Sequence, residues 1–150
     1  MFLLPLTIHQ ASPQDQDWIN EQYKSIDFRL ADLQQDYVAI ASWEKEPAGL
    51  GRLQPLDSNA WELGGMYVFE SFRKKGIAGR LVQHLLAQVP AGSTIYCLPF
   101  EPLLSFYKNY GFQETKPEQV DKVPEVVRSK LDWCNTSRYP DPVLLLEQHK

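Results

Sequence analysis

The sequence has few cysteines, few histidines and no long hydrophobic run, and each shortage excludes a class of protein. Two cysteines, Cys97 and Cys134, are too few for a disulfide framework, and each lies in an apolar stretch that favours a buried free thiol. The three histidines lack zinc-ligand spacing, so we expect no metal. No apolar run approaches the about 20 residues of a membrane span. The apolar start Met1–Leu6 lacks the basic segment of a signal peptide, so we expect a cytoplasmic protein that binds no membrane.

Positive charge is also scarce. The chain has 15 lysines and arginines against 19 acidic residues, a net charge of −4, which argues against nucleic acid as a partner. A length of 150 residues with 43% hydrophobic residues is typical of one globular domain, residues 1–150.

Apolar periodicity predicts an α/β (α+β) chain. Strands are expected at 6–10, 37–43, 48–56, 60–69, 94–98, 112–115 and 143–147. Helices are expected after Ser12-Pro13, over 78–89, from Pro102 and from Pro124, with a further short one around Leu30 and Leu33. The order predicts a mixed sheet, with an antiparallel meander over 37–69 and a parallel strand pair within 60–98.

The most informative stretch is Arg73–Gly79, which follows the strand expected at 60–69 and leads into an amphipathic helix. Three successive cations, the unpaired N–H groups of a helix start, and glycines at 76 and 79 suit a phosphate group. The alternative is a basic surface turn. The spacing excludes a P-loop and the Gly-x-Gly-x-x-Gly fingerprint of dinucleotide binding.

Arg73-Lys74-Lys75-Gly76-Ile77-Ala78 resembles the Arg/Gln-x-x-Gly-x-Gly/Ala signature of the GNAT N-acetyltransferase superfamily. The context is similar as well. Met66-Tyr67-Val68 resembles the end of that family's fourth strand, and Tyr107–Phe112 resembles its Tyr-x-x-x-Gly-Phe element. The resemblance covers about residues 6–116.

The resemblance implies a mixed, mostly antiparallel sheet of six to seven strands flanked by four to five helices. It implies acetyl-CoA as cosubstrate and an amine of a small molecule or a protein as acceptor, and it allows a homodimer through a sheet edge. The residues expected to hold the cofactor share one loop and the strand before it; they are Met66, Tyr67, Val68, Arg73, Lys74, Lys75, Gly76, Ile77, Ala78 and Gly79.

Two side chains are catalytic candidates. Tyr107 is similar to the family tyrosine near the cofactor sulfur and would act as general acid, with Tyr110 as its rival and core packing as the alternative. Glu62 lies where some members carry a glutamate base; the alternatives are a solvent-facing strand residue and a structural ion pair. Alternation would place Glu62, Gly64, Met66 and Val68 on one side of their strand. The stretch Leu98–Leu103 lacks the asparagine that many members carry.

Two further readings of the chain stay open beside an enzyme. One is a CoA-binding regulatory module without efficient catalysis. The other is a nucleic-acid binder with a basic loop, but the sequence lacks an aromatic stacking platform beside that loop. Aromatic residues that could shape an acceptor pocket are Trp18, Tyr23, Phe28, Trp133 and Tyr139, although core packing is favoured for most of them.

Overall fold

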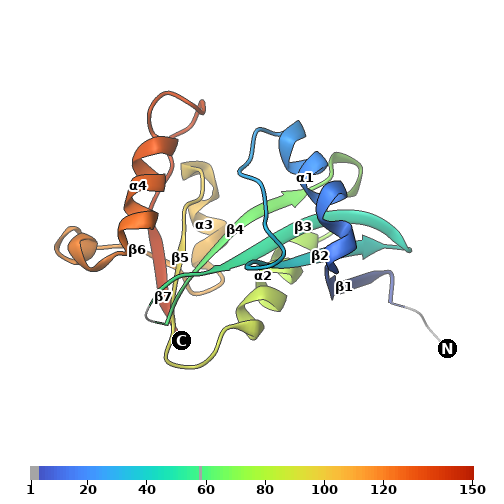
Figure 1. The fold of residues 1–150 in the computed structure, drawn as a ribbon, viewed down its shortest axis with the longest axis horizontal. Helices are drawn as coiled ribbons and strands as arrows, with labels where there is room; N and C mark the ends of the chain where they lie inside the picture. The colour runs from blue at the N-terminus through green and yellow to red at the C-terminus, as the bar shows by residue number, and fades with distance from the viewer. Residues whose placement is uncertain (1–3, 58) are drawn as a thin grey trace. The chain divides into compact units, whose positions relative to one another are not determined.

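The structure is a computed structural model that describes residues 4–57 and 59–150 (Figure 1). Residues 1–3 of the apolar start and Ser58 lie outside the described residues. The strands are β1 (Leu6–Gln10), β2 (Tyr37–Trp43), β3 (Glu46–Pro55), β4 (Ala60–Val68), β5 (Thr94–Cys97), β6 (Gln113–Glu114) and β7 (Leu146–His149). The α-helices of the described chain are α1 (Gln16–Ser25), α2 (Ile77–Gln88), α3 (Leu104–Lys108) and α4 (Glu125–Cys134).

These strands form a seven-stranded sheet in the order β1-β2-β3-β4-β5-β7-β6. The pairs β1–β2, β2–β3, β5–β7 and β6–β7 are antiparallel, whereas β4 and β5 are parallel and are joined through α2. The predicted fold class, a mixed and mostly antiparallel sheet with four to five helices, is therefore confirmed.

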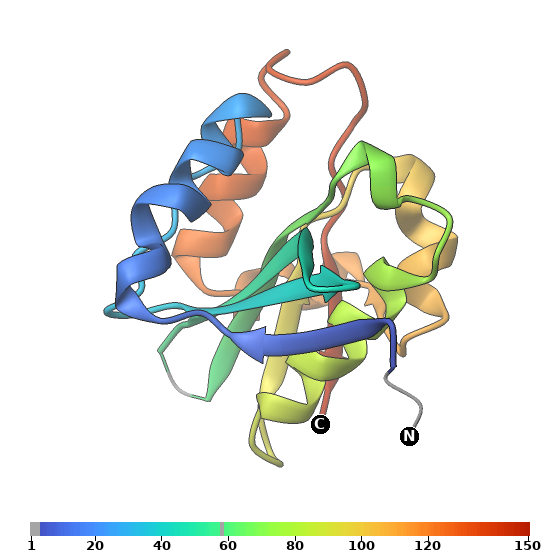
Figure 2. The same cartoon turned by 90° about the vertical axis from the view of Figure 1, so that its right-hand side faces the viewer.

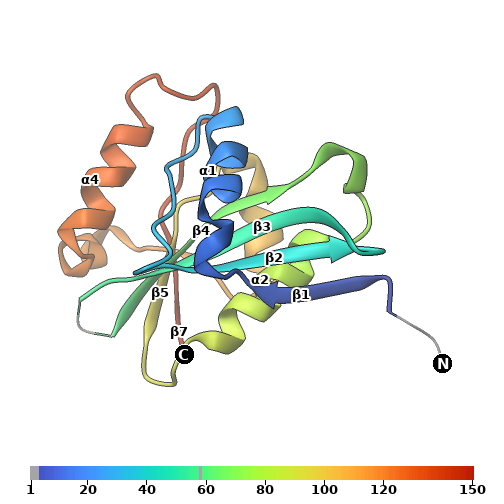
Figure 3. The same ribbon diagram turned by 45° about the vertical axis from the view of Figure 1, so that its right-hand side comes forward.

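The described chain divides into two compact units, and β4 contributes to both. The first contains the chain up to Gln54 together with Gly65–Gln88. In this unit α1 and α2 cover opposite faces of the strands (Figure 3). Larger side chains of the strands face α1, and they form a core with it; this core includes Ile19, Tyr23, Val38, Ile40 and Leu50. Figure 2 shows β1 at the open edge of this part of the sheet.

Small residues let α2 approach the other face. A Cβ atom on Gly51 would lie 2.9 Å from Leu85 of α2 and 2.7 Å from the Met66 sulfur, closer than packed atoms allow. A Cβ atom on Gly49 would lie 3.4 Å from Leu81 of the same helix. The helix that begins at the cation-rich loop is thus held directly against β3.

Gly65 interrupts β4. Its φ of +60° lies in the left-handed region, and a positive φ inside a strand is typical of a β-bulge. The Tyr23 hydroxyl donates a hydrogen bond to the Gly65 carbonyl oxygen at 2.7 Å. Strict alternation therefore does not continue across Gly65, and the expectation that Glu62, Gly64, Met66 and Val68 share one side is wrong for this reason.

Replacing Gly65 by alanine should destabilise the protein by about 2–3 kcal/mol, because positive φ is unfavourable for alanine and its Cβ would lie 2.5 Å from the Tyr23 hydroxyl. The matched control is Gly64→Ala, whose Cβ would meet only a Glu62 carboxylate oxygen at 3.4 Å. Urea denaturation of both variants measures the difference. Equal midpoints would contradict the role given to Gly65.

The second unit contains Pro55–Gly64 and Val89–Lys150. Here α4 packs on one face of β4 and β5, and the shared core holds Ala60, Tyr96, Val123 and Val127. Proline precedes α4 directly, as predicted, since Pro124 is its N-cap residue. Phe112 is fully buried beside α3, and Gly111 ends that turn with a φ of +94°.

One predicted helix and the bounds of three predicted strands are wrong. The segment 26–36 holds no helix in the described chain, because Asp32 and Asp36 side chains bond backbone N–H groups there and Asn20 bonds Ala31. The last strand is β7 at Leu146–His149 rather than 143–147, since Val143 instead forms a bridge to Phe100. β3 begins at Glu46, after a two-residue turn with positive φ, and β6 is only two residues long.

Candidate functional site

The loop at 73–76 lies between β4 and the first turn of α2. Lys74 has a φ of +65° and Gly76 a φ of +77°, so the main chain turns sharply twice before the helix begins at Ile77. The Arg73 Nε donates a hydrogen bond of 3.1 Å to the Val68 carbonyl and ties the loop to the end of β4. Successive left-handed turns before a helix are typical of anion-binding backbone.

Space is open beside this backbone. A Cβ atom added to Gly76 would have no described neighbour within 4 Å. Arg73, Lys74, Lys75 and Gly76 are exposed, whereas Ile77 and Gly79 are buried and anchor the helix start. The Lys75 ammonium lies 4.8 Å from the centre of the Trp43 ring, a cation–π contact that orients it. These residues fit an exposed di-anionic group such as a pyrophosphate.

Met66, Tyr67 and Val68, the strand residues expected to hold the cofactor, are half-buried in β4. Tyr67 packs on the core beneath α1, with its ring 5.0 Å from that of Phe69. In the described chain the register with β5 runs from Ala60 to Leu63. Residues 66–68 lie beyond the paired part of β4 and β5. Their backbone on that side is therefore not engaged by β5, as pairing with a ligand requires.

Tyr107, the general-acid candidate, is 5% exposed on α3. Its side chain shares a hydrogen bond with Cys97 at the end of β5, and its ring makes edge-to-face contacts with Phe106 and Phe112. Burial raises the pKa of the Tyr107 hydroxyl well above its usual value, and Cys97 adds to the rise. The hydroxyl therefore stays protonated at neutral pH and can donate. Its rival Tyr110 is half-buried beside Phe106.

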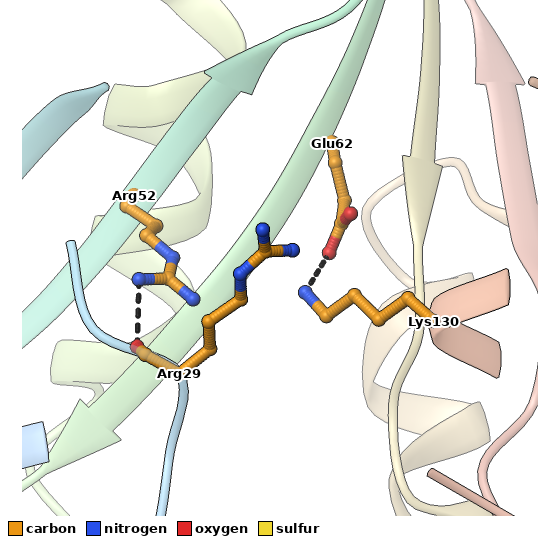
Figure 4. A network of polar contacts seen from close by, with 4 residues as sticks. All are labelled: Arg29, Arg52, Glu62 and Lys130. Carbon is orange, nitrogen blue, oxygen red and sulfur yellow. Dashed lines mark hydrogen bonds and ion pairs between the residues drawn. The ribbon is translucent and has the colours of Figure 1, made fainter. Parts of the chain in front are cut away.

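Glu62, the candidate base, is 4% exposed and forms an ion pair with Lys130 of α4 (Figure 4). The same figure shows a separate contact of the first unit, in which Arg52 donates to the Arg29 carbonyl at 2.8 Å. A buried carboxylate needs such a partner, because an unpaired buried charge is strongly unfavourable. The structural alternative for Glu62, an ion pair, is thus present in the protein.

Cys97 interacts with both catalytic candidates, Glu62 and Tyr107. Burial raises the pKa of the Cys97 thiol, the Glu62 carboxylate raises it further, and Lys130 and the Tyr107 hydrogen bond oppose the rise. The thiol is neutral at physiological pH and so is a poor nucleophile. Both cysteines are free and buried, as the sequence predicts.

Sequence reasoning missed Lys130 and the position of Cys97. One signal for Lys130 was in the sequence, because it lies three residues after Val127 and four before Cys134, on the stripe of α4 that the apolar pattern marks as buried. Its partner Glu62 lies 68 residues away, and no local pattern connects them.

Most aromatic residues suggested for an acceptor pocket have structural roles. Tyr23 is fully buried, and Trp18 and Phe28 pack against the same core. Trp133 is 45% exposed, with the Arg138 guanidinium 4.0 Å from its ring centre, and Tyr139 packs on Phe100. These last contacts belong to the second unit, beside α4.

Three structural observations bear on other predictions. The described residues include no helix long and apolar enough to cross a membrane. They also include no group of three His, Cys, Asp or Glu side chains placed to hold a metal ion. A cavity of 690 Å³ in the second unit lies where β4 and β5 begin, beside Ala60, Thr94 and His149, and none of the predicted site residues lines it.

Comparison with known proteins gives the family. The model of the acetyltransferase (GNAT) family matches residues 6–112. Among curated proteins, YsnE of Bacillus subtilis, an uncharacterized N-acetyltransferase, is 31% identical over 85 residues, which are 51% of this chain and 56% of that protein. The chain thus spans little more than half the length of that relative.

Solved structures share the fold. Naa50 of Arabidopsis thaliana, in complex with a bisubstrate analogue, has a TM-score of 0.72 at 15% identity, over 98% of this chain and 100% of that one. A GNAT family acetyltransferase of Elizabethkingia anophelis with acetyl-CoA bound has a TM-score of 0.64 at 21% identity, over 97% of this chain and 99% of that one. Because the family model matches well over half of its length, this chain belongs to the GNAT acetyltransferase family.

Proposed function

We propose that the protein is an N-acetyltransferase that moves the acetyl group of acetyl-CoA to an amine. One observation carries the proposal: the exposed backbone of residues 73–76, with positive φ at Lys74 and Gly76, leads into the free N–H groups of α2 beside three cations. The backbone of Arg73–Gly79 would hold the pyrophosphate, and Met66–Val68 would pair with the pantetheine arm. Acetyl-CoA supplies an activated thioester.

Two proton transfers fall to side chains of the second unit. Glu62 would accept a proton from the acceptor amine, directly or through water. The Tyr107 hydroxyl, which stays protonated at neutral pH, would donate a proton to the departing sulfur. Because the Cys97 thiol stays neutral, a covalent acyl-cysteine step is disfavoured, and direct attack by the amine remains.

Removing the Tyr107 hydroxyl tests this role. Tyr107→Phe should lower kcat about 100-fold with little change in CoA affinity, since the proton donor is lost while the ring contacts remain. The control is Tyr110→Phe, which should retain activity. Release of free thiol with a panel of amines measures turnover, and calorimetry measures CoA binding. Full activity of Tyr107→Phe would remove Tyr107 from the mechanism.

A CoA-binding module without efficient catalysis is the second candidate. It is favoured by two contacts that occupy the catalytic groups, namely Lys130 on Glu62 and Cys97 on Tyr107. Tight CoA binding with no thiol release for any amine, small or on a peptide, would support this candidate and contradict the enzyme. Organisation as one domain over 1–150, and a homodimer through a sheet edge, stay predictions.

A further inference from the structure

We infer that Lys130 is itself an acyl acceptor, so that the protein acetylates its own Lys130 side chain. This inference rests on the proposed function, because the acetyl group must come from acetyl-CoA. Nothing in the sequence motifs points to Lys130. The observation that carries it is a contact: the Lys130 amine pairs with the Glu62 carboxylate, the group proposed to deprotonate the acceptor amine.

The burial of this amine is unusual for a lysine. The Lys130 side chain is 16% exposed and that of Glu62 is 5% exposed, so the pair is largely removed from water while one part of Lys130 stays accessible. In another ion pair of the described residues, His149 with Glu147, the histidine side chain is 71% exposed. Val127 and Cys134 lie one turn before and one turn after Lys130, and both are buried. The face of α4 that carries Lys130 therefore points toward the protein interior.

The three side chains of the proposed step each interact with Cys97. Lys130 and Glu62 both act electrostatically on the Cys97 thiol, and Tyr107 shares a hydrogen bond with it. An amine and a base in direct contact, and a proton donor hydrogen-bonded to the thiol whose pKa both of them influence, therefore lie within the second unit. Stability alone explains this pair poorly, because an apolar pair of similar volume is often as favourable in a buried position.

The proposed step balances as follows. The Lys130 ammonium gives one proton to the Glu62 carboxylate, and the freed lone pair of Nζ attacks the thioester carbonyl carbon. A C–N bond forms and the C–S bond breaks; the nitrogen loses a second proton as the amide forms. The departing sulfur takes a proton from Tyr107, which is reprotonated from the medium. The products are acetyl-lysine, free CoA thiol and one proton, with no oxidant or reductant.

The experiment uses the full chain and acetyl-CoA labelled in the acetyl group. Intact mass and peptide mapping should show one acetyl group per chain, on Lys130, at least about 10-fold faster than on exposed Lys122, because Lys130 is held at the reacting groups. The rate constant should not change with protein concentration, as expected of transfer within one chain. Lys130→Arg should abolish the label, since arginine can still pair with Glu62 but remains protonated. Lys122→Arg should retain it.

The possible outcomes distinguish self-acetylation of Lys130 from the proposed acetyltransferase function. Thiol release with added amines but no label on Lys130 would overturn self-acetylation and leave the enzyme intact. No thiol release under any condition would overturn the proposed function itself. Equal labelling of Lys130 in unfolded protein, or in Gly76→Val, would mean uncatalysed acetylation and would also overturn the inference. Should Lys130→Arg fold poorly, concentration-independent labelling of the unaltered chain at Lys130 decides the question.

Discussion

Replacing Gly76 by valine should lower the affinity for CoA about 1,000-fold, which corresponds to about 4 kcal/mol. The φ of +77° at Gly76 is unfavourable for a β-branched residue, so the backbone should relax and withdraw its N–H groups from the pyrophosphate. Loss of two charge-assisted hydrogen bonds, each contributing about 1.5–3 kcal/mol, gives the expected size. Isothermal titration calorimetry with CoA measures it.

Gly92→Val is the matched control. Gly92 also has a positive φ, +87°, and also has open space where a Cβ atom would lie, but it belongs to the turn before β5. Both variants should lose similar stability, about 1–2 kcal/mol, from the same backbone strain. Only the Gly76 variant should lose CoA affinity. Unchanged affinity in Gly76→Val would count against the whole cofactor site.

Replacing Lys130 by methionine should destabilise the protein by about 3–5 kcal/mol, because it leaves the Glu62 carboxylate buried without a cation. Methionine keeps most of the lysine volume, so the loss reports the charge rather than a cavity. The free energy of unfolding comes from urea denaturation, with the slope compared to confirm that the unfolding transition is unchanged.

A double variant separates the effect of charge pairing on stability from the effect of side-chain packing. In Glu62→Leu with Lys130→Met, both charges are absent, and most of the lost stability should return. Lys122→Met, on an exposed lysine before α4, should change stability little. If Lys130→Met and Lys122→Met unfold at the same urea concentration, the ion pair contributes no stability in solution.

Periodicity in the sequence predicts most elements because their patterns are local. β1 has the predicted bounds of 6–10, and α2 at Ile77–Gln88 follows the stripe that begins near Ala78. The parallel pairing of β4 with β5 follows from the helix between them, since parallel strands need a crossover. Where local hydrogen bonds compete with the pattern, as at residues 26–36, the prediction of a helix is wrong.

The family-specific loop is equally local. Its glycine, cations and helix start lie within seven residues, so a resemblance in sequence carries directly to backbone geometry. The side chains of Glu62 and Tyr107 are different, because their roles depend on what lies beside them. Gly65 illustrates the difference: its effect on β4 arises from a positive φ supported by the Tyr23 hydroxyl, 42 residues away in the chain.

The sequence by itself determined the family, the order of strands and helices, and the segment expected to bind the pyrophosphate. Each of these depends on neighbours in the chain, through periodicity, turn residues and one short motif. Only the tertiary structure decided that Lys130 pairs with Glu62 and that Tyr107 meets Cys97. The physical reason is that these contacts join distant segments, and their energies come from burial and charge pairing that exist only once the chain has folded.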